Sequence, residues 1–106
     1  MSMAYPKPHA IRSRQYKAWI RIQRCIVPGC TRPSEASHVG PHSYGSKADD
    51  LRTLPMCHPH HVGGNDAFHE LGRKKFEDHF GLDLNELIVQ HIIRFLEEEL
   101  QFGDRD

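Results

Sequence analysis

The chain has 106 residues, the length of a single domain, and 38% of them are hydrophobic while 26% are charged. The 14 basic and 14 acidic side chains cancel, which excludes a uniformly basic nucleic-acid-binding protein. No apolar run approaches the roughly 18 residues of a membrane span, and the N-terminal residues show no apolar signal core. We therefore expect a cytoplasmic protein without a membrane partner.

The charges are unevenly distributed along the chain. Residues 1–34 carry seven basic side chains and no acidic one, whereas residues 77–106 carry nine acidic side chains and two basic ones. Such asymmetry predicts one face that attracts a polyanion such as DNA, and an acidic face that is turned elsewhere. The alternative is that both ends are ordinary solvated surface.

Residues 1–12 include two prolines and are expected to form a flexible arm ahead of a single domain at 13–106. Residues 13–23 predict a short helix with Ser13 as its N-cap. The apolar residues of this segment recur at i, i+3 and i+4 and share one face: Tyr16, Trp19 and Ile20. The alternation within 19–22 leaves a strand open as the alternative.

The middle of the chain predicts a hairpin. Residues 25–34 are typical of a turn, because Pro28-Gly29 lies between two cysteines. Residues 35–40 and 51–56 are candidate strands, and the loop between them is rich in glycine, serine and aspartate.

Two helices are predicted to follow the hairpin. Residues 66–79 fit one helix with Asp66 as its cap, and Gly81 supplies the stop. Residues 83–102 give the clearest amphipathic helix, with Asp83 at its start. The apolar face of this C-terminal helix is wide for so small a domain, which makes it a candidate surface for homodimerisation.

Three cysteines and a histidine have the spacing of a structural zinc site: Cys25-x4-Cys30 followed by Cys57-x2-His60. An odd number of cysteines cannot close a disulfide set, whereas three thiolates and one imidazole complete a tetrahedron around Zn²⁺. His58 and His61 are alternative fourth ligands. On a helix His61 would point about 100° away from His60, which frees it for a second metal ion. The alternative is that the cysteines are buried free thiols.

A longer ordered set of residues includes this site: Ala36-Ser37-His38, Lys47-Ala48-Asp49-Asp50, Leu54-Pro55-Met56-Cys57-x2-His60-His61, and His69 through Glu77. The combined order resembles the HNH (ββα-metal) endonuclease family, most closely its phage- and prophage-type subset, over about residues 15–83. The resemblance implies an α+β fold. In this ββα-metal core a two-stranded hairpin and the next helix enclose a catalytic ion, with zinc knuckles and with flanking N- and C-terminal helices.

The resemblance also implies roles for single residues. His38 matches the general base, and Asp50 and His61 match catalytic positions that hold a Mg²⁺ or Mn²⁺ ion. His42 and His69 are further candidate ligands of that ion. The structural Zn²⁺ ligands are Cys25, Cys30, Cys57 and His60. Taken alone, His38 fits a hydrogen-bonded strand histidine, Asp50 a turn residue, His61 a support for the zinc site and His69 a solvated side chain.

One position departs from the family pattern. Many members have Asp or His directly before the general base, where it binds the metal, but this chain has Ser37, a poor ligand. His42 is the candidate replacement. Without one, the chain would be a weak or inactive nuclease, so the alternative function is a zinc-containing DNA-binding or adaptor module. A third interpretation is a protein–protein module that uses the acidic C-terminal helix.

The implied activity is metal-dependent hydrolysis of DNA phosphodiester bonds, and a monomer with one site would nick a duplex. This chemistry needs an activated water and relief of the charge that develops in the transition state. Histidine suits the first task because it titrates close to neutral pH. Arg52, Arg73, Lys74 and Lys75 lie close in sequence to the catalytic positions and are candidate contacts to DNA phosphates, or else a solvated surface.

Overall fold

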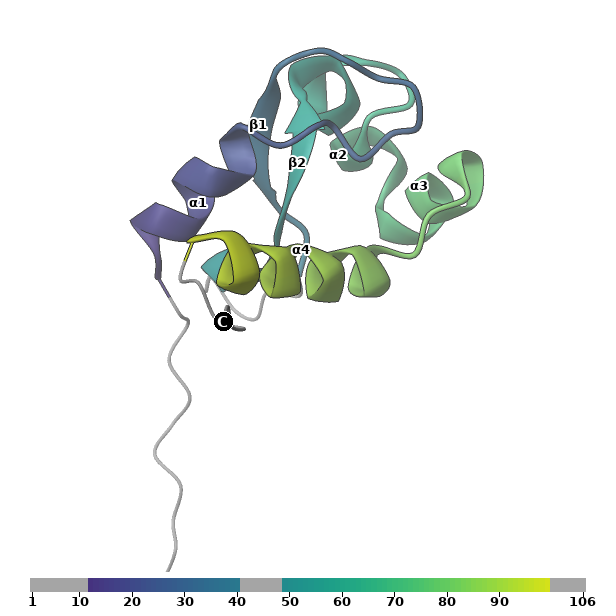
Figure 1. Ribbon diagram of the computed structural model, residues 1–106. Helices are drawn as coiled ribbons and strands as arrows, with labels where there is room; N and C mark the ends of the chain where they lie inside the picture. The colour runs from purple at the N-terminus through teal and green to yellow at the C-terminus, as the bar shows by residue number, and fades with distance from the viewer. Residues whose placement is uncertain (1–11, 41–48, 100–106) are drawn as a thin grey trace, which may run out of the picture.

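The computed structural model describes residues 12–40 and 49–99. The elements in chain order are α1 (Arg14–Arg21), β1 (Ser34–His38), the short helical turn η1 (Asp50–Arg52), β2 (Thr53–Cys57), the turn η2 (Pro59–Gly63), α2 (Phe68–Leu71), α3 (Arg73–Phe80) and α4 (Leu84–Glu99). Within these ranges they form an α+β fold around one two-stranded sheet, which confirms the expected class. Figure 1 shows α4 running across one end of the hairpin, with α1 beside β1 and with α2 and α3 on the side of β2.

Helix α1 begins where the sequence predicts it. The Ser13 side chain accepts a hydrogen bond from the Tyr16 amide at 3.0 Å, so the N-cap is confirmed and the strand alternative is wrong. Tyr16, Trp19 and Ile20 are buried against Phe95 of α4 and form one of two apolar clusters. This contact holds α1 against the C-terminal half of α4.

The two strands pair in antiparallel register, with Ser34 opposite Cys57 and His38 opposite Thr53. The expected strand bounds are displaced by one or two residues. The start of β2 moves because residues 50–52 form the turn η1. A second apolar cluster lies between the hairpin, the cysteine loop, α3 and α4: Cys25, Val27, Val39, Leu54, Met56, Cys57, Phe76, Leu84 and Ile88. This apolar cluster supports the residues of the candidate sites.

Successive side chains of β1 point to opposite faces of the sheet, as in any strand. Ala36 packs against the α1 cluster, and His38 contacts Asp50 beside the start of α1. Glu35 contacts His61 of η2 instead. The hairpin therefore carries two separate polar sites, one on each face.

The predicted single helix at 66–79 is wrong. The chain forms two helices, α2 and α3, with Gly72 between them at φ 81° and ψ 166°. Glycine adopts this conformation readily and other residues do not, so the break is built into the sequence. Asp66 caps neither helix, and its carboxylate lies 3.8 Å from Nε2 of His79.

Helix α4 starts as predicted, since Oδ1 of Asp83 accepts a hydrogen bond from the Glu86 amide at 3.1 Å. Its last predicted turn lies outside the described residues, as do His42 and nearly all of the predicted arm at 1–12. Val89 and Ile93 remain half exposed on α4, and dimerisation through this helix stays a prediction. No helix within the described ranges is long and apolar enough to cross a bilayer.

Candidate metal centres

The structure brings the four predicted zinc ligands together. One ligand atom from each of Cys25, Cys30, Cys57 and His60 lies within 4.8 Å of the other three. The Cys30 and Cys57 sulfurs are 3.7 Å apart, and Nδ1 of His60 lies 3.1 Å from Sγ of Cys57 and 3.7 Å from Sγ of Cys25. Metal–ligand bonds of about 2.3 Å to sulfur and 2.0–2.1 Å to nitrogen imply separations of about 3.6–3.8 Å in a tetrahedron. The group therefore fits a bound Zn²⁺.

The fold holds these ligands through backbone contacts. The cysteine loop closes with a hydrogen bond from the Cys30 amide to the Val27 carbonyl, and the Ile26 amide donates to the Pro55 carbonyl of β2. Cys57 ends β2, and the η2 turn that follows it returns His60 to the same point. Two distant parts of the chain are thus joined at the base of the hairpin.

The pKa values of two of the thiols, Cys25 and Cys30, are shifted in opposite directions. Burial raises the pKa of Cys25 to about 11. Burial also raises the pKa of Cys30, but hydrogen bonds from the Arg32 backbone and from the other two cysteines outweigh it, so the net shift is downward. A cation bound between the sulfurs would remove this difference, because a thiol that coordinates a metal ion is deprotonated.

His61 turns away from this cluster. Its Nδ1 lies 2.8 Å from Oε1 of Glu35, and its Nε2 lies 3.2 Å from Nε2 of His69. Nδ1 of His58 lies 2.9 Å from the other oxygen of Glu35. We call these four side chains, Glu35, His58, His61 and His69, the Glu35 cluster. Glu35 was not predicted as a site residue. The available signal was its acidic side chain, which lies two residues before Ser37 on the same face of the strand.

The Glu35 cluster has the hydrogen-bonding pattern of an oriented metal ligand. A carboxylate only accepts, so Nδ1–H of His61 donates to Glu35 and Nε2 of His61 keeps its lone pair. Carboxylates hold metal-binding histidines in this way in many proteins. The hydrogen bond from His61, followed by that from His58, outweighs partial burial and lowers the pKa of Glu35. Two imidazole nitrogens 3.2 Å apart have the separation expected of neighbouring ligands on one ion.

His38 and Asp50 form a second polar site on the opposite face of the hairpin. Nε2 of His38 lies 2.8 Å from Oδ1 of Asp50, whose Oδ2 accepts the Ser13 amide at 2.7 Å. Nζ of Lys17 lies 3.7 Å from the same carboxylate, which is almost fully buried. Burial raises the pKa of Asp50, but the His38 and Ser13 hydrogen bonds and the Lys17 charge outweigh it and lower the pKa overall.

The expected sharing of one ion by Asp50 and His61 finds no support in these contacts. Both oxygens of Asp50 bind partners beside α1, whereas His61 binds Glu35 on the other face. The physical reason is the alternation of β1, which separates Glu35 from His38. Ser37 is fully buried, so it is not available to an ion at either site.

A family described as "Protein of unknown function (DUF968)" matches residues 1–103. The chain belongs to the DUF968 family.

A relative of this DUF968 chain is "Uncharacterized protein YdfU" of Escherichia coli (strain K12), 30% identical over 105 residues. The match covers 95% of the chain but 27% of YdfU, so the chain spans about a quarter of the length of this relative. No solved structure matches the chain significantly.

Three of the four predicted DNA contacts of the DUF968 chain have protein partners. Arg52 lies 4.0 Å from the Asp49 carboxylate, and Lys74 lies 4.0 Å from that of Asp78. Arg73 donates to the Val39 carbonyl and to Oδ1 of Asn85, and it also lies near Glu77. Lys75 is exposed on α3. Ion pairs this exposed are weak, but they leave these side chains less positive than the sequence indicates.

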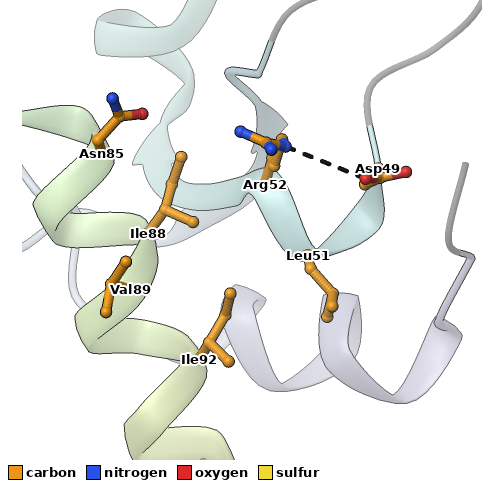
Figure 2. Close-up of a pocket in the computed structure, with 7 residues that line it drawn as sticks. All are labelled: Asp49, Leu51, Arg52, Asn85, Ile88, Val89 and Ile92. Carbon is orange, nitrogen blue, oxygen red and sulfur yellow. Dashed lines mark ion pairs between the residues drawn. The ribbon is translucent and has the colours of Figure 1, made fainter.

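An apolar groove of the DUF968 chain lies between η1 and α4. It encloses about 460 Å³ and is lined by Asp49, Leu51, Arg52, Asn85, Ile88, Val89 and Ile92. Figure 2 shows the aliphatic side chains along the groove and the Arg52–Asp49 ion pair at one end. The groove holds none of the predicted catalytic or metal-binding residues, so it does not contribute to the candidate site.

Proposed function

We propose that the chain is a zinc-stabilised, metal-dependent endonuclease of the HNH type that nicks DNA. The observation that carries the proposal is the divergence of two adjacent imidazoles. His60 lies among the three cysteine sulfurs, while His61 turns to Glu35 and His69. One short turn thus supplies a structural site and a separate, more open site.

The structural site supports this function by fixing the turn. Cys25 and Cys30 come from one loop, and Cys57 and His60 come from the end of β2 and from η2. With Zn²⁺ bound, the position of His61 is set by its neighbour His60, and much of the folding free energy of so small a domain comes from the metal. In this proposal the hairpin, η2 and α2 would form the ββα-metal core.

The Glu35 cluster supports an open site for a Mg²⁺ or Mn²⁺ ion. His61 and His69 direct Nε2 atoms toward each other, and Glu35 fixes the tautomer of His61. When bound, such an ion would stabilise the charge that develops on the phosphodiester and on the leaving oxygen. Two protein nitrogens leave further coordination positions for water and a phosphate oxygen.

The His38–Asp50 pair supports the role of general base. Asp50 is ionised at neutral pH and accepts Nε2–H of His38, so Nδ1 of His38 keeps the lone pair that removes a proton from water. A carboxylate holds a histidine in the reactive tautomer in the same manner in serine proteases. Within the described residues β1 pairs with β2 alone, and α1 lies beside it.

A second function is favoured by two specific observations. Ser37 is fully buried, and Asp50 also anchors the start of α1 through Ser13. His38 and Asp50 would then be structural, and the chain would be a zinc-containing DNA-binding module without catalysis.

Plasmid nicking separates the two functions. Zinc-loaded protein is incubated with supercoiled plasmid and Mg²⁺ or Mn²⁺, and His38→Ala, His69→Asn and the control His79→Asn are compared. Loss of a general base lowers the rate by about 10²–10⁴-fold, so we expect His38→Ala to be nearly inactive and the control to match the wild type. Equal nicking by His38→Ala and wild type would exclude this base. A wild type that binds DNA but nicks with neither ion would support the second function.

A further inference from the structure

Three arginines around the end of α1 line a groove that has no acidic side chain among its described lining residues. The groove encloses about 330 Å³ and is lined by Arg21, Ile22, Gln23, Arg24, Thr31, Arg32, Pro33 and Ser34. It therefore joins the end of α1, the segment after the cysteine loop and the first residue of β1. The three arginines belong to the basic segment 1–34 that the charge distribution predicts to face a polyanion, but none of them was among the individual DNA contacts predicted from the sequence.

The arginines of this groove form no ion pair with a carboxylate in the part of the chain that the structure describes. Arg21, Arg24 and Arg32 are exposed, and within residues 12–40 and 49–99 no carboxylate lies within ion-pair distance of them. The nearest acidic residue along the chain is Glu35, and His58 and His61 bind it on the other face of β1. The three guanidinium groups thus contrast with Arg52, Arg73 and Lys74, which have carboxylate partners.

The surroundings of the arginines are ordered by the rest of the fold. Oγ of Ser34 donates to the Gln23 carbonyl at 2.8 Å, and Nη2 of Arg94 donates to Oε1 of Gln23 at 2.7 Å. Ile22, the C-cap residue of α1, is 77% exposed beside the arginines. An apolar contact flanked by cations suits the sugar and phosphate surface of a nucleic acid.

We infer that the groove formed by Arg21, Arg24 and Arg32 binds the phosphodiester backbone of DNA. This inference rests on the proposed function, because it places the substrate of that nuclease. Arginine is well suited to the task, since its planar guanidinium binds phosphate through two hydrogen bonds. Ser34 of the groove and Glu35 of the open metal site are consecutive in β1, so the groove and that site lie at the same end of the strand.

The test compares two pairs of charge-removing substitutions. Arg21→Gln/Arg32→Gln removes two charges from the groove, and Lys74→Gln/Lys75→Gln removes two from α3. Binding of each zinc-loaded protein to a labelled 30-base-pair duplex is followed by fluorescence anisotropy between about 50 and 200 mM salt, without Mg²⁺ or Mn²⁺. Counterion release predicts that each lost phosphate contact lowers the slope of log affinity against log salt by about 0.9.

The expected result is a slope that falls by about 2 in the arginine pair, with affinity about tenfold to a hundredfold weaker, and by no more than about 0.9 in the lysine pair, because Lys74 is already paired with Asp78. Equal losses in both pairs, no loss in the arginine pair, or no binding by the wild type would overturn the inference. If Arg32→Gln disturbs the nearby cysteine loop, Arg21→Glu alone serves, because Arg21 lies on α1. Nicking is measured separately, so a protein that binds through the groove without cutting counts against the nuclease proposal alone.

Discussion

Nε2 of His38 lies 2.8 Å from Oδ1 of Asp50, and the other oxygen of the same carboxylate accepts the amide of Ser13 at 2.7 Å. One buried carboxylate thus connects β1, η1 and the first turn of α1. Lys17 and Arg12 add positive charge at 3.7 and 3.8 Å. The pair that we propose for catalysis is therefore also part of the scaffold.

Asp50→Ala is expected to lower the free energy of unfolding by about 2–4 kcal/mol, because it leaves the buried Ser13 amide and His38 without an acceptor. Asp50→Asn keeps one acceptor oxygen and should cost less. Urea unfolding monitored by Trp19 fluorescence measures both. The control is Asp78→Ala, whose exposed ion pair with Lys74 should contribute under about 1 kcal/mol. Similar midpoints for Asp50→Ala and Asp78→Ala would show that the carboxylate is not an anchor.

His60→Asn and His61→Asn are expected to differ in zinc content although the two positions are adjacent. Only His60 lies among the cysteine sulfurs, so its loss should release zinc and lower the melting temperature. His61→Asn should keep one zinc per chain, because its imidazole contacts Glu35 and His69. Elemental analysis after dialysis and thermal melts give the two readouts. Equal zinc loss in both variants would contradict the separation of the two sites.

Glu35→Gln is expected to weaken Mn²⁺ binding about 10–100-fold while zinc content stays the same. The carboxylate does not need to touch the ion for this effect, because it orients His61 through Nδ1. Free Mn²⁺ in a titration is measured by electron paramagnetic resonance. The matched control is Glu70→Gln, an exposed carboxylate that lies next to His69 in α2. The proposed open site would be refuted by wild-type affinity in the Glu35 variant, or by a wild type that binds no Mn²⁺.

Acid is expected to destabilise the fold through His91. Burial, partly offset by the hydrogen bond to the Leu87 carbonyl, lowers the pKa of His91 below its ordinary value. His91 then binds a proton near pH 6.5 in the unfolded chain but only at lower pH in the folded chain. The free energy of unfolding therefore falls as the pH drops below about 6.5. The loss should level off below the lowered pKa of the folded chain.

The measurement for His91 is the unfolding midpoint between pH 7.5 and 5.5. His91→Leu should flatten this dependence relative to wild type, while the exposed His79→Asn should not. Release of zinc in acid affects all three proteins alike, so the difference between the curves isolates His91. Parallel curves for wild type and His91→Leu would contradict the prediction.

Local patterns were sufficient to predict several parts of this molecule. Ser13 capping and the i, i+3, i+4 spacing predicted α1, and the amphipathic pattern after Asp83 predicted α4. The zinc ligands were predictable because two short spacings, Cys25 to Cys30 and Cys57 to His60, each describe one turn. In each case the pattern that predicts the feature lies within a few residues along the chain, although the two halves of the zinc site come from distant segments.

Other parts depended on contacts that no local pattern carries. Glu35 meets His61 from 26 residues away, and Asp50 meets Ser13 from 37 residues away. The break at Gly72 was missed because the apolar spacing continues across it, although a glycine inside a helical pattern was the available signal. Most of the site residues are therefore those predicted from the sequence, but their partners in the structure are different.

The strand that carries Glu35 and His38 is more sensitive to its length than to its composition. These residues are separated by an odd number of positions, so removing or adding one residue between them would turn the imidazole toward the carboxylate's side of the sheet. A conservative replacement at Ala36 leaves the directions of the Glu35 and His38 side chains unchanged. A deletion of one residue would put both side chains on the same face and leave the other face without its polar site. Relatives that share this chemistry should tolerate varied residues in this segment but no change in its spacing.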